Sequence, residues 1–311
     1  MSNTKIIFFG SPDFSVPSLK KLYGAGFDIV AVVTSPDKPV GRKQILTPSP
    51  IKTEALNLGV SVFSPTTLKD GVFFKEFKEF FPDLCVVVSY GKIIPQDFLN
   101  VPRYGFLNIH PSLLPKYRGP TPIQSAILNG DDETGISIMS LDKDMDHGPV
   151  LCQIKYQNLN LKSFEQASSD LSLLGADLLV QTIPKWINND IMPKEQDHEL
   201  ATFTKKYTRD DGKINWAEPA ILILNKVRAL GTDPGTWTVW NDKIINILKC
   251  EIIPDSKNEK AGSISKIDKN IVVKTETDYI ALELIKPEGK KEMSGQAFAN
   301  GNKNFVGSVL K

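Results

Sequence analysis

Apolar runs of strand length alternate with stretches of helical spacing over the first two-thirds of the chain. Residues 16–26 and 49–59 have helical spacing and end at glycine, as many helices do. The apolar runs between them are continuous, which is typical of parallel strands covered on both faces. This alternation predicts an α/β fold with a Rossmann-like open, mostly parallel sheet, which binds ligands beyond the carboxyl ends of its strands. We expect its strands at 5–10, 28–35, 60–63, 84–89, 105–111, 135–142 and 148–156.

The alternation of strands and helices ends with one long helix, and the pattern changes after Asn188. A long helix is predicted to begin near Ser163, because Ser163 and Gln166 have capping-box spacing. A polar, weakly periodic stretch follows, then one helix at 218–230 and several short strand-like runs separated by turns. Such runs suggest a small β-barrel, OB-like in type. We therefore predict an α/β domain at 1–189, a linker at 190–208 and a β-barrel domain at 209–311.

Composition narrows the possible classes of protein. A chain of 311 residues is long for one core, which supports two domains. Its 37 basic and 36 acidic residues nearly cancel, so contact with a nucleic acid would need local basic patches. Cys85, Cys152 and Cys250 match no metal-ligand spacing and fit a reducing compartment. No apolar run has membrane-spanning length and no signal-peptide pattern is present, so we expect a cytoplasmic protein.

Several common catalytic motifs are missing from the sequence. The turn after the first expected strand lacks both G-x-G-x-x-G and G-x-x-x-x-G-K-[ST], which argues against a dinucleotide or nucleotide-phosphate site. No G-x-S-x-G elbow occurs, so serine-hydrolase chemistry has no support. The three histidines, His110, His147 and His198, have no metal-ligand spacing, and we expect no metal.

One of these histidines lies between an apolar run and a proline-stiffened loop. Asn108 and His110 are two residues apart, so on a strand both side chains point to the same face. They lie at the carboxyl end of that strand. An amide beside an imidazole suits a tetrahedral carbonyl intermediate, because one group can stabilise the oxyanion and the other can move protons. A buried histidine bonded to backbone would fit the same spacing.

A candidate carboxylate follows later in the chain. Asp146 ends a strand-like run and precedes a His-Gly-Pro turn, in which backbone can approach a ligand closely. Asp142 and Asp144 are its neighbours, so the alternative is a solvated acidic turn. We favour Asp146 as the functional carboxylate, because the glycine and proline directly shape the loop behind it.

The two segments that carry these residues resemble the formyltransferase family that uses 10-formyltetrahydrofolate. "NIHPSLLPKYRG" at 108–119 is similar to its Asn-x-His and Ser-Leu-Leu-Pro segment, and "GISIMSLDKDMDHGPVLCQ" at 135–153 to its Gly and Asp-x-Gly signature. The resemblance runs essentially end to end and includes "FFGSPDFSVPSL" and "PEGKKEMSGQAF". Within the family, the chain is most similar to the branch that formylates methionyl-tRNA.

The resemblance implies roles for individual residues. Asn108, His110 and Asp146 would be catalytic: Asn108 and protonated His110 would stabilise the oxyanion, and Asp146 would hold His110 in position. The formyl donor would be 10-formyltetrahydrofolate, and neither a metal nor a covalent intermediate is implied. The implied folate contacts are Tyr90, Gly91, Lys92, Ile93, Ile94, Pro95, Ser112, Leu113, Leu114, Pro115 and Asp142.

The formyl acceptor is indicated by chain length and by one loop. A purine-pathway formyltransferase would leave everything beyond about residue 190 unexplained. Lys38, Arg42 and Lys43 lie on a loop after the second strand that matches the family's tRNA-inserting loop, although a solvated surface loop has the same composition. Pro111 and the sequence at 146–149 are instead similar to the glycinamide ribonucleotide branch.

We therefore expect a monomeric enzyme that formylates initiator methionyl-tRNA, with a tRNA-binding β-barrel domain. The alternatives are a formyltransferase acting on a small amine, such as glycinamide ribonucleotide or an amino-sugar nucleotide, and a folate-hydrolysing enzyme. A protein of another class, a non-catalytic tRNA- or folate-binding protein, would be the third. The intact Asn108, His110 and Asp146 argue against that third alternative.

Overall fold

The structure is a computed structural model that describes residues 4–41, 43–254 and 259–311. The chain forms two compact units that are interleaved in sequence. The first contains residues up to Pro122, Glu133–Gln157 and Ser168–Thr204, and the second contains Ile123–Asp132, Asn158–Ala167 and Lys205–Lys311. Segments from before residue 189 thus contribute to both units.

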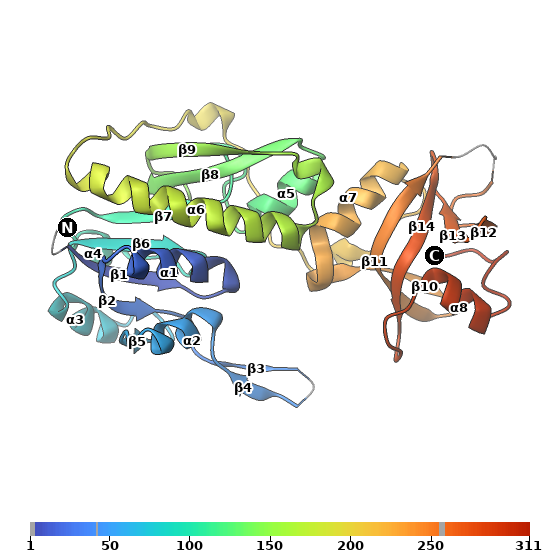
Figure 1. Ribbon diagram of the computed structural model, residues 1–311, viewed down its shortest axis with the longest axis horizontal. Coiled ribbons are helices and arrows are strands. Elements are labelled where there is room, and N and C mark those ends of the chain that lie inside the picture. Colours follow the sequence, from blue (N-terminus) through green and yellow to red (C-terminus); the bar gives the residue numbers. More distant parts are fainter. Residues whose placement is uncertain (1–3, 42, 255–258) are drawn as a thin grey trace. The chain divides into compact units, whose positions relative to one another are not determined.

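A seven-stranded sheet in the order β5-β2-β1-β6-β7-β8-β9 forms the centre of the first unit (Figure 1). Neighbouring strands from β5 to β7 run parallel, whereas β8 runs antiparallel to both β7 and β9. The predicted Rossmann-like, mostly parallel sheet is therefore confirmed. Its strands are β1 (Lys5–Gly10), β2 (Asp28–Val33), β5 (Val62–Phe63), β6 (Leu84–Val88), β7 (Phe106–His110), β8 (Glu133–Ser140) and β9 (Val150–Gln157).

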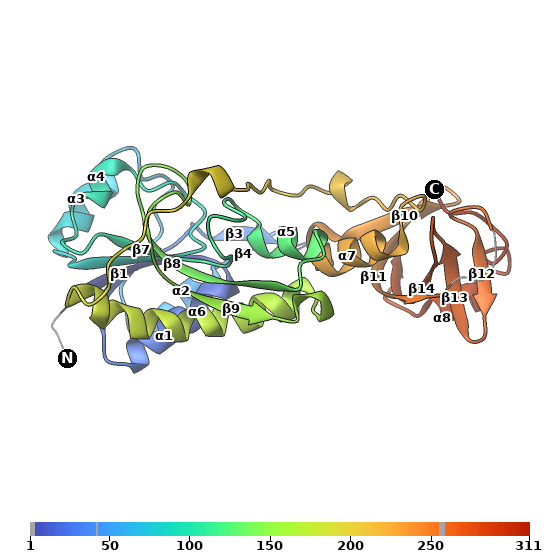
Figure 2. The ribbon, with the colours of Figure 1, turned by 90° about the horizontal axis from the view of Figure 1, so that it is seen from above.

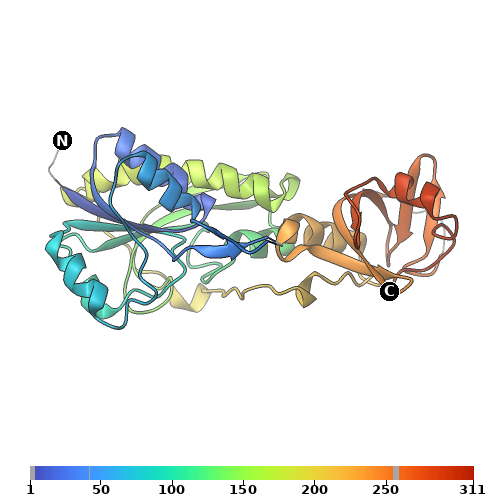
Figure 3. The same cartoon turned by 90° about the horizontal axis from the view of Figure 1, so that it is seen from below.

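Helices cover both faces of this sheet. In Figures 2 and 3, α1 (Val16–Gly24) and α6 (Phe164–Ile187) lie on one face, and α3 (Val72–Glu79) and α4 (Gln96–Leu99) lie on the other. The predicted capping box opens α6: the Ser163 amide donates to Gln166 Oε1 at 3.0 Å, and the Gln166 amide donates to Ser163 Oγ at 3.3 Å. None of the described helices is both long enough and apolar enough to span a membrane.

The alternation of side chains along β7 decides which face carries the candidate site. Phe106 packs among the aromatic rings of the α3 and α4 face, where its ring centroid lies 5.6 Å from that of Phe9. Ile109 points to the opposite face and approaches α6 so closely that a Cβ on Gly175 would lie 2.9 Å from Ile109 Cγ2. Asn108 and His110 share the period of Phe106, so they project beyond the aromatic cluster at the carboxyl end of the strand.

The second unit contains a five-stranded antiparallel sheet in the order β10-β11-β14-β13-β12. The last residues of the chain bond to both edges of this sheet. The Ile264 amide of β12 donates to the Ser308 carbonyl at 2.9 Å, and Val239 of β10 exchanges two backbone bonds with Lys311. This closure produces the predicted barrel-like domain. Its strands are β10 (Thr236–Trp240), β11 (Lys243–Ile253), β12 (Ile264–Ile267), β13 (Asn270–Lys274) and β14 (Tyr279–Pro287).

The remaining elements are short, and the sequence pattern predicted only some of them. Helices α2 (Pro50–Asn57) and α7 (Ala220–Leu230) were expected. An antiparallel hairpin after β2 was not expected, nor were four short helices. These unpredicted elements are the hairpin strands β3 (Lys38–Val40) and β4 (Ile45–Thr47), together with α3, α4, α5 (Pro122–Leu128) and α8 (Gly295–Gly301).

Candidate active site

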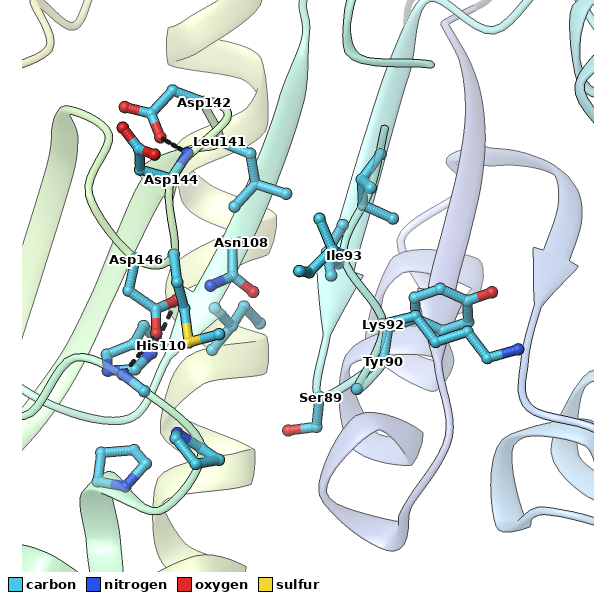
Figure 4. Close-up of a pocket in the computed structure, with 18 of the residues that line it drawn as sticks. Ser89, Tyr90, Lys92, Ile93, Asn108, His110, Leu141, Asp142, Asp144 and Asp146 are labelled. Atoms are coloured by element: carbon cyan, nitrogen blue, oxygen red, sulfur yellow. Dashed lines mark hydrogen bonds and ion pairs between the residues drawn. The ribbon is translucent and has the colours of Figure 1, made fainter. Parts of the chain in front are cut away.

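Strand β7 lies where the sheet changes from parallel to antiparallel pairing, and its carboxyl end carries the first two candidate residues. Asn108 is 7% exposed and His110 is 4% exposed. Within the part of the chain that the structure describes, the Asn108 side chain has no hydrogen-bond partner. It points into a cavity, as Figure 4 shows. Its amide is therefore available to a ligand.

Both ring nitrogens of His110 face acceptors. Nε2 lies 2.9 Å from the Tyr117 carbonyl oxygen, and Nδ1 lies 3.5 Å from Asp146 Oδ1. Because a carbonyl oxygen only accepts hydrogen bonds, Nε2 carries a hydrogen. In a neutral ring, Nδ1 would then have no hydrogen, and its lone pair would face the Asp146 carboxylate. An imidazolium carries a hydrogen on both nitrogens, so its charge would face Asp146 while Nε2 donates to the Tyr117 carbonyl. The alternative of a buried histidine bonded to backbone therefore describes His110 in this structure, and its Nδ1 still faces Asp146.

Asp146 is held in a backbone conformation that few residues adopt. Its φ is +50°, in the left-handed region, and its side chain is only 13% exposed. Oδ2 accepts a 2.8 Å hydrogen bond from the Gly119 amide, while Oδ1 faces His110. Gly119 itself has a φ of +113°, and a Cβ there would lie 2.7 Å from Thr204 Oγ1. Asp146 therefore belongs to a fixed pair with His110, and the alternative of a solvated acidic turn does not hold for it.

The three residues line one cavity of about 440 Å³. This size is within the range of about 300–1,000 Å³ typical of small-molecule sites. Of the other residues predicted to bind folate, six line the same cavity: Tyr90, Gly91, Lys92, Ile93, Ile94 and Asp142. Eleven lining residues were not predicted: Val87, Ser89, Ile109, Pro111, Gly119, Pro120, Pro122, Leu141, Lys143, Asp144 and Met145.

Five residues predicted to bind folate do not line the cavity: Pro95, Ser112, Leu113, Leu114 and Pro115. Most of them belong to a loop that is tied to the neighbouring strands. Ser112 Oγ donates to the Lys116 carbonyl at 2.6 Å, and the Leu114 amide donates to Ser137 Oγ of β8 at 3.1 Å. Gln153 Nε2 of β9 donates to the Leu114 carbonyl at 2.9 Å. This loop supports the strand that carries His110.

The opposite wall of the cavity is the turn after β6. Ser89 has a φ of +50° and Gly91 a φ of +77°, so the backbone reverses sharply there. Tyr90 is 2% exposed and contacts Phe9 edge to face; burial raises the pKa of its hydroxyl to about 12. In Figure 4 this hydroxyl points away from His110 and Asp146. Lys92 Nζ donates to the Pro65 and Thr66 carbonyls, so this lysine braces the turn.

Two exposed apolar side chains line this cavity, one from each wall. Ile93 is 67% exposed and Met145 is 61% exposed. Exposed apolar side chains in a cavity indicate a ligand with an apolar surface. Met145 lies between Asp144 and Asp146, two aspartates already singled out in the sequence. Nothing in the spacing of these aspartates marked Met145 itself as a residue that lines the cavity.

Of the three residues predicted to contact tRNA, the structure describes Lys38 and Lys43, which lie on the β3–β4 hairpin. Lys38 and Lys43 are exposed, and Arg42 lies outside the described residues. Lys52, from the same stretch of sequence, pairs with Asp37 at 2.8 Å. The hairpin also exposes Val40, Ile45 and Leu46.

The residues that the structure describes contain no cluster of three or more His, Cys, Asp or Glu side chains that could hold a metal ion. The fold and the cavity define an α/β protein with an amide, an imidazole and a carboxylate gathered beyond the carboxyl ends of its strands. A formyl transferase family model matches residues 4–183, and a formyl transferase C-terminal domain model matches residues 206–303. The chain belongs to the formyl transferase family, as the motifs predicted.

Curated relatives match the chain over nearly its whole length. It is 41% identical over 298 residues to a methionyl-tRNA formyltransferase from Thermodesulfovibrio yellowstonii, covering 96% of each chain. It is 38% identical over 311 residues to a methionyl-tRNA formyltransferase from Caldanaerobacter subterraneus subsp. tengcongensis, covering 99% of this chain and 100% of that one.

Two solved structures share the fold at low sequence identity. An N-formyltransferase from Helicobacter canadensis, solved with folinic acid and dTDP-3-aminofucose, has a TM-score of 0.68 and 20% identity, covering 90% of this chain and 98% of that one. HypX from Aquifex aeolicus, solved with tetrahydrofolic acid, has a TM-score of 0.66 and 14% identity, covering 98% of this chain and 48% of that one.

Proposed function

We propose that the protein transfers the formyl group of 10-formyltetrahydrofolate to the α-amine of initiator methionyl-tRNA, giving N-formylmethionyl-tRNA for translation initiation. The observation that carries this proposal is the meeting of Asn108, His110 and Asp146 in one cavity of a formyl transferase fold. The names of curated relatives with about 40% identity over nearly the whole chain support methionyl-tRNA as the acceptor.

In the proposed reaction, the amine of methionyl-tRNA attacks the formyl carbon and forms a carbon–nitrogen bond. The formyl oxygen then carries negative charge, and the Asn108 amide, which has no protein partner, donates to it. The intermediate collapses when the bond to N10 of the folate breaks. The amine gives up a proton, and N10 takes one, so tetrahydrofolate leaves with its proton count balanced.

His110 and Asp146 provide the charge and the proton path in this mechanism. Because Nε2 is committed to the Tyr117 carbonyl, Nδ1 is the ring nitrogen left for the reaction. The 3.5 Å separation between Nδ1 and Asp146 Oδ1 is longer than a good hydrogen bond, so a hydrogen on Nδ1 would remain available to an oxyanion that approaches it. Asp146 keeps the ring oriented and accepts the amine proton through water.

The donor would lie between the two walls of the cavity. Backbone groups of Tyr90–Ile94 would read the edge of the pterin ring, and Ile93 and Met145 would cover its apolar faces. Asp142 would contribute from the loop that carries Asp146. Ser112–Pro115 and Pro95 would act indirectly, by fixing the strand and the turn next to the donor.

The acceptor would engage the β3–β4 hairpin through Lys38, Arg42 and Lys43. Positive charge on a projecting hairpin suits a phosphate backbone. We also propose that the barrel domain at 209–311 binds tRNA. The chain enters it through the segment at 190–208, of which Gln196–Thr204 remains with the first unit. We further propose that the protein acts as a monomer in the cytoplasm, where charged initiator tRNA is used.

One assay tests the proposal directly. The purified protein and 10-formyltetrahydrofolate are supplied with initiator methionyl-tRNA, unacylated initiator tRNA or glycinamide ribonucleotide, and formylated product is measured. Formylation of methionyl-tRNA alone is expected. Preferred formylation of glycinamide ribonucleotide would shift the function to a small amine, in line with Pro111 and the sequence at 146–149. Absence of product with every acceptor would favour a non-catalytic binding protein.

A further inference from the structure

The segment Gln196–Thr204, which we call the clamp segment, runs beside the loop that serves both His110 and Asp146. The Arg118 amide donates to the Thr202 carbonyl at 2.8 Å, and the Thr204 amide donates to the Arg118 carbonyl at 2.8 Å. The Tyr117 amide donates to Thr202 Oγ1, also at 2.8 Å. Tyr117 and Gly119 flank Arg118 and supply the carbonyl for His110 and the amide for Asp146. The clamp segment therefore fixes the backbone groups that orient both side chains.

Gln196 connects the clamp segment to the Asp146 loop from the other side. Its Nε2 donates to the carbonyls of Asp146 at 3.0 Å and Gly148 at 2.7 Å. Its Oε1 accepts from Arg118 Nε at 3.1 Å and Nη2 at 2.8 Å. All of the bonding capacity of this buried amide is used, and only one orientation works, because a flip would oppose donor to donor and acceptor to acceptor. Gln196 therefore transmits the position of the guanidinium to Asp146.

Arg118 is unusual because it is a buried arginine that has no carboxylate partner within the described part of the chain. Its side chain is 3% exposed, and among the described residues it forms no ion pair. Its charged group bonds instead to Gln196 Oε1 and, through Nη2, to His198 Nδ1 at 2.8 Å. Burial of a cation without a counter-charge is costly. A stability role is a poor explanation for such a group, whereas a rigid planar fork that sets the orientation of an amide explains its chemistry.

The clamp segment also contacts the far end of the same loop. The His198 ring stacks on the His147 ring, with centroids 4.0 Å apart and an angle of 7° between the planes. His147 Nδ1 lies 2.6 Å from Asp142 Oδ2. The loop from Asp142 to Gly148 is thus held at both ends. At its centre, Asp146 keeps the left-handed backbone that aims its carboxylate at His110.

We propose that Gln196 and Arg118 are positioning residues for formyl transfer: they hold Asp146 in the conformation that faces His110. Neither touches the donor or the acceptor. The proposal rests on the proposed function, because it assigns Asp146 and His110 to the reaction. A positioning role differs from a purely structural role in its expected effects. Disturbing Gln196 or Arg118 should lower turnover and change its pH dependence without a matching loss of folding or of folate affinity.

Gln196→Glu removes the donor side of this amide and keeps its acceptor side. The carboxylate keeps the length and still accepts from Arg118, but it opposes the Asp146 and Gly148 carbonyls and cannot donate to them. Asn225→Asp is the matched control, since Asn225 is also a buried amide whose Oδ1 accepts from an arginine, Arg228, in the second unit. Each variant is assayed with initiator methionyl-tRNA for kcat, KM for 10-formyltetrahydrofolate and the pH profile of kcat, and its melting temperature is measured.

For Gln196→Glu we expect kcat to fall roughly tenfold to hundredfold, because a small misplacement of a catalytic group can cost up to about a hundredfold in rate. Its KM for the donor should stay within about threefold of the wild type, and its pH profile should change shape. Asn225→Asp should keep the wild-type kcat and pH profile even where its melting temperature falls as much. Gln196→Asn, whose shorter side chain cannot span Arg118 and the two carbonyls, should reproduce the loss of kcat.

The possible failures of this experiment are distinct. An inactive wild type overturns the proposed function and leaves the clamp segment without a reaction to serve, so the positioning proposal falls with it. An active wild type with Gln196 variants within about twofold of it in kcat overturns the positioning proposal alone. Loss of folding in both Gln196 variants would assign the clamp segment to stability and overturn the proposal as well.

Discussion

The two walls of the cavity are built in different ways. The wall that carries His110 and Asp146 is held by side-chain hydrogen bonds that reach far along the chain, such as the bond from Gln196 to the Asp146 carbonyl. The wall formed by the turn after β6 is shaped mainly by its own backbone, with Ser89 and Gly91 at positive φ and Ile93 exposed. Lys92 braces this turn by donating to the Pro65 and Thr66 carbonyls. The wall with His110 and Asp146 holds polar groups in fixed directions, whereas the turn after β6 presents an exposed apolar surface.

This difference follows from what each wall must do in the proposed reaction. A catalytic hydrogen bond weakens steeply when its angle changes, so donors and acceptors must be oriented before the substrate arrives. Binding of a flat, partly apolar ring depends on shape and buried area, which a turn with exposed apolar side chains can supply. Substitutions in the two walls should therefore affect different kinetic constants.

The largest expected effect is on the first wall. His110→Ala and Asn108→Ala should each lower kcat by about a hundredfold or more, because each removes a group that acts on the developing oxyanion. Donor binding should change little, because the proposed donor contacts come mainly from the other wall. Steady-state kinetics and equilibrium binding of 10-formyltetrahydrofolate measure the two effects separately. Near-normal turnover in either variant would contradict the mechanism.

Asp146→Asn should lower kcat with similar severity, by about a hundredfold or more. The amide keeps the size of the side chain and one oxygen for the Gly119 amide, but it removes the charge opposite His110 Nδ1. The charge that faces His110 is then lost, so the pH profile of kcat should change shape.

The pH profile of kcat tests this reading of Asp146. Asp97→Asn is a control for the loss of one negative charge, because Asp97 is exposed on α4 and lies outside the cavity. This control should keep the wild-type profile. A profile for Asp146→Asn that is scaled down but unchanged in shape would argue against the pairing of Asp146 with His110.

The contrast between the walls also explains which parts of the site the sequence predicts. Asn108 and His110 share a face because side chains alternate along a strand, so their meeting was predicted from spacing alone. Asp146 was found by its position before a His-Gly-Pro turn. The turn at Tyr90–Ile94 came from resemblance, and the structure agrees that its residues line the cavity. Local pattern is sufficient for groups whose direction is set by one strand or one turn.

The bonds that orient the first wall could not be predicted from the sequence pattern. Gln196 lies 50 residues from Asp146 and 78 from Arg118, in a stretch whose polar composition predicted a linker. The β3–β4 hairpin was missed because its strands are three residues each and fully exposed, so no alternation of buried and exposed positions marks them. Long-range contacts of this kind depend on how the chain packs, which periodicity does not encode.

On the second wall, Ile93→Ser should raise KM for the donor about tenfold with little change in kcat. Full burial of an aliphatic side chain against a ligand contributes about 1.5–3 kcal/mol, and about 1.4 kcal/mol corresponds to tenfold in affinity. Val72→Ser is the matched control, because Val72 is 68% exposed, against 67% for Ile93, and does not line the cavity. An unchanged KM for Ile93→Ser would remove the donor from this wall.

The smallest expected effect concerns the β3–β4 hairpin, which lies outside both walls. A variant of this hairpin tests the proposed contact with the acceptor. The double variant Arg42→Ala with Lys43→Ala, which removes two positive charges, should weaken the use of methionyl-tRNA and leave donor binding unchanged. Each lost phosphate contact should reduce the slope of log affinity against log salt by roughly 0.7–0.9. The measurement is KM for methionyl-tRNA at several salt concentrations, with folate binding beside it.

The matched control for the hairpin variant removes two charges elsewhere in the same unit. Lys20 and Lys21 on α1 pair with Glu54 and Asp177, so Lys20→Ala with Lys21→Ala makes the same change in net charge. If both double variants reduce the salt slope equally, the effect is one of overall charge, which acts at long range and is screened by salt. If only the hairpin variant changes the slope, the hairpin contacts RNA. An unchanged slope in the hairpin variant would return that loop to a solvated surface and reopen the choice of acceptor in favour of a small amine.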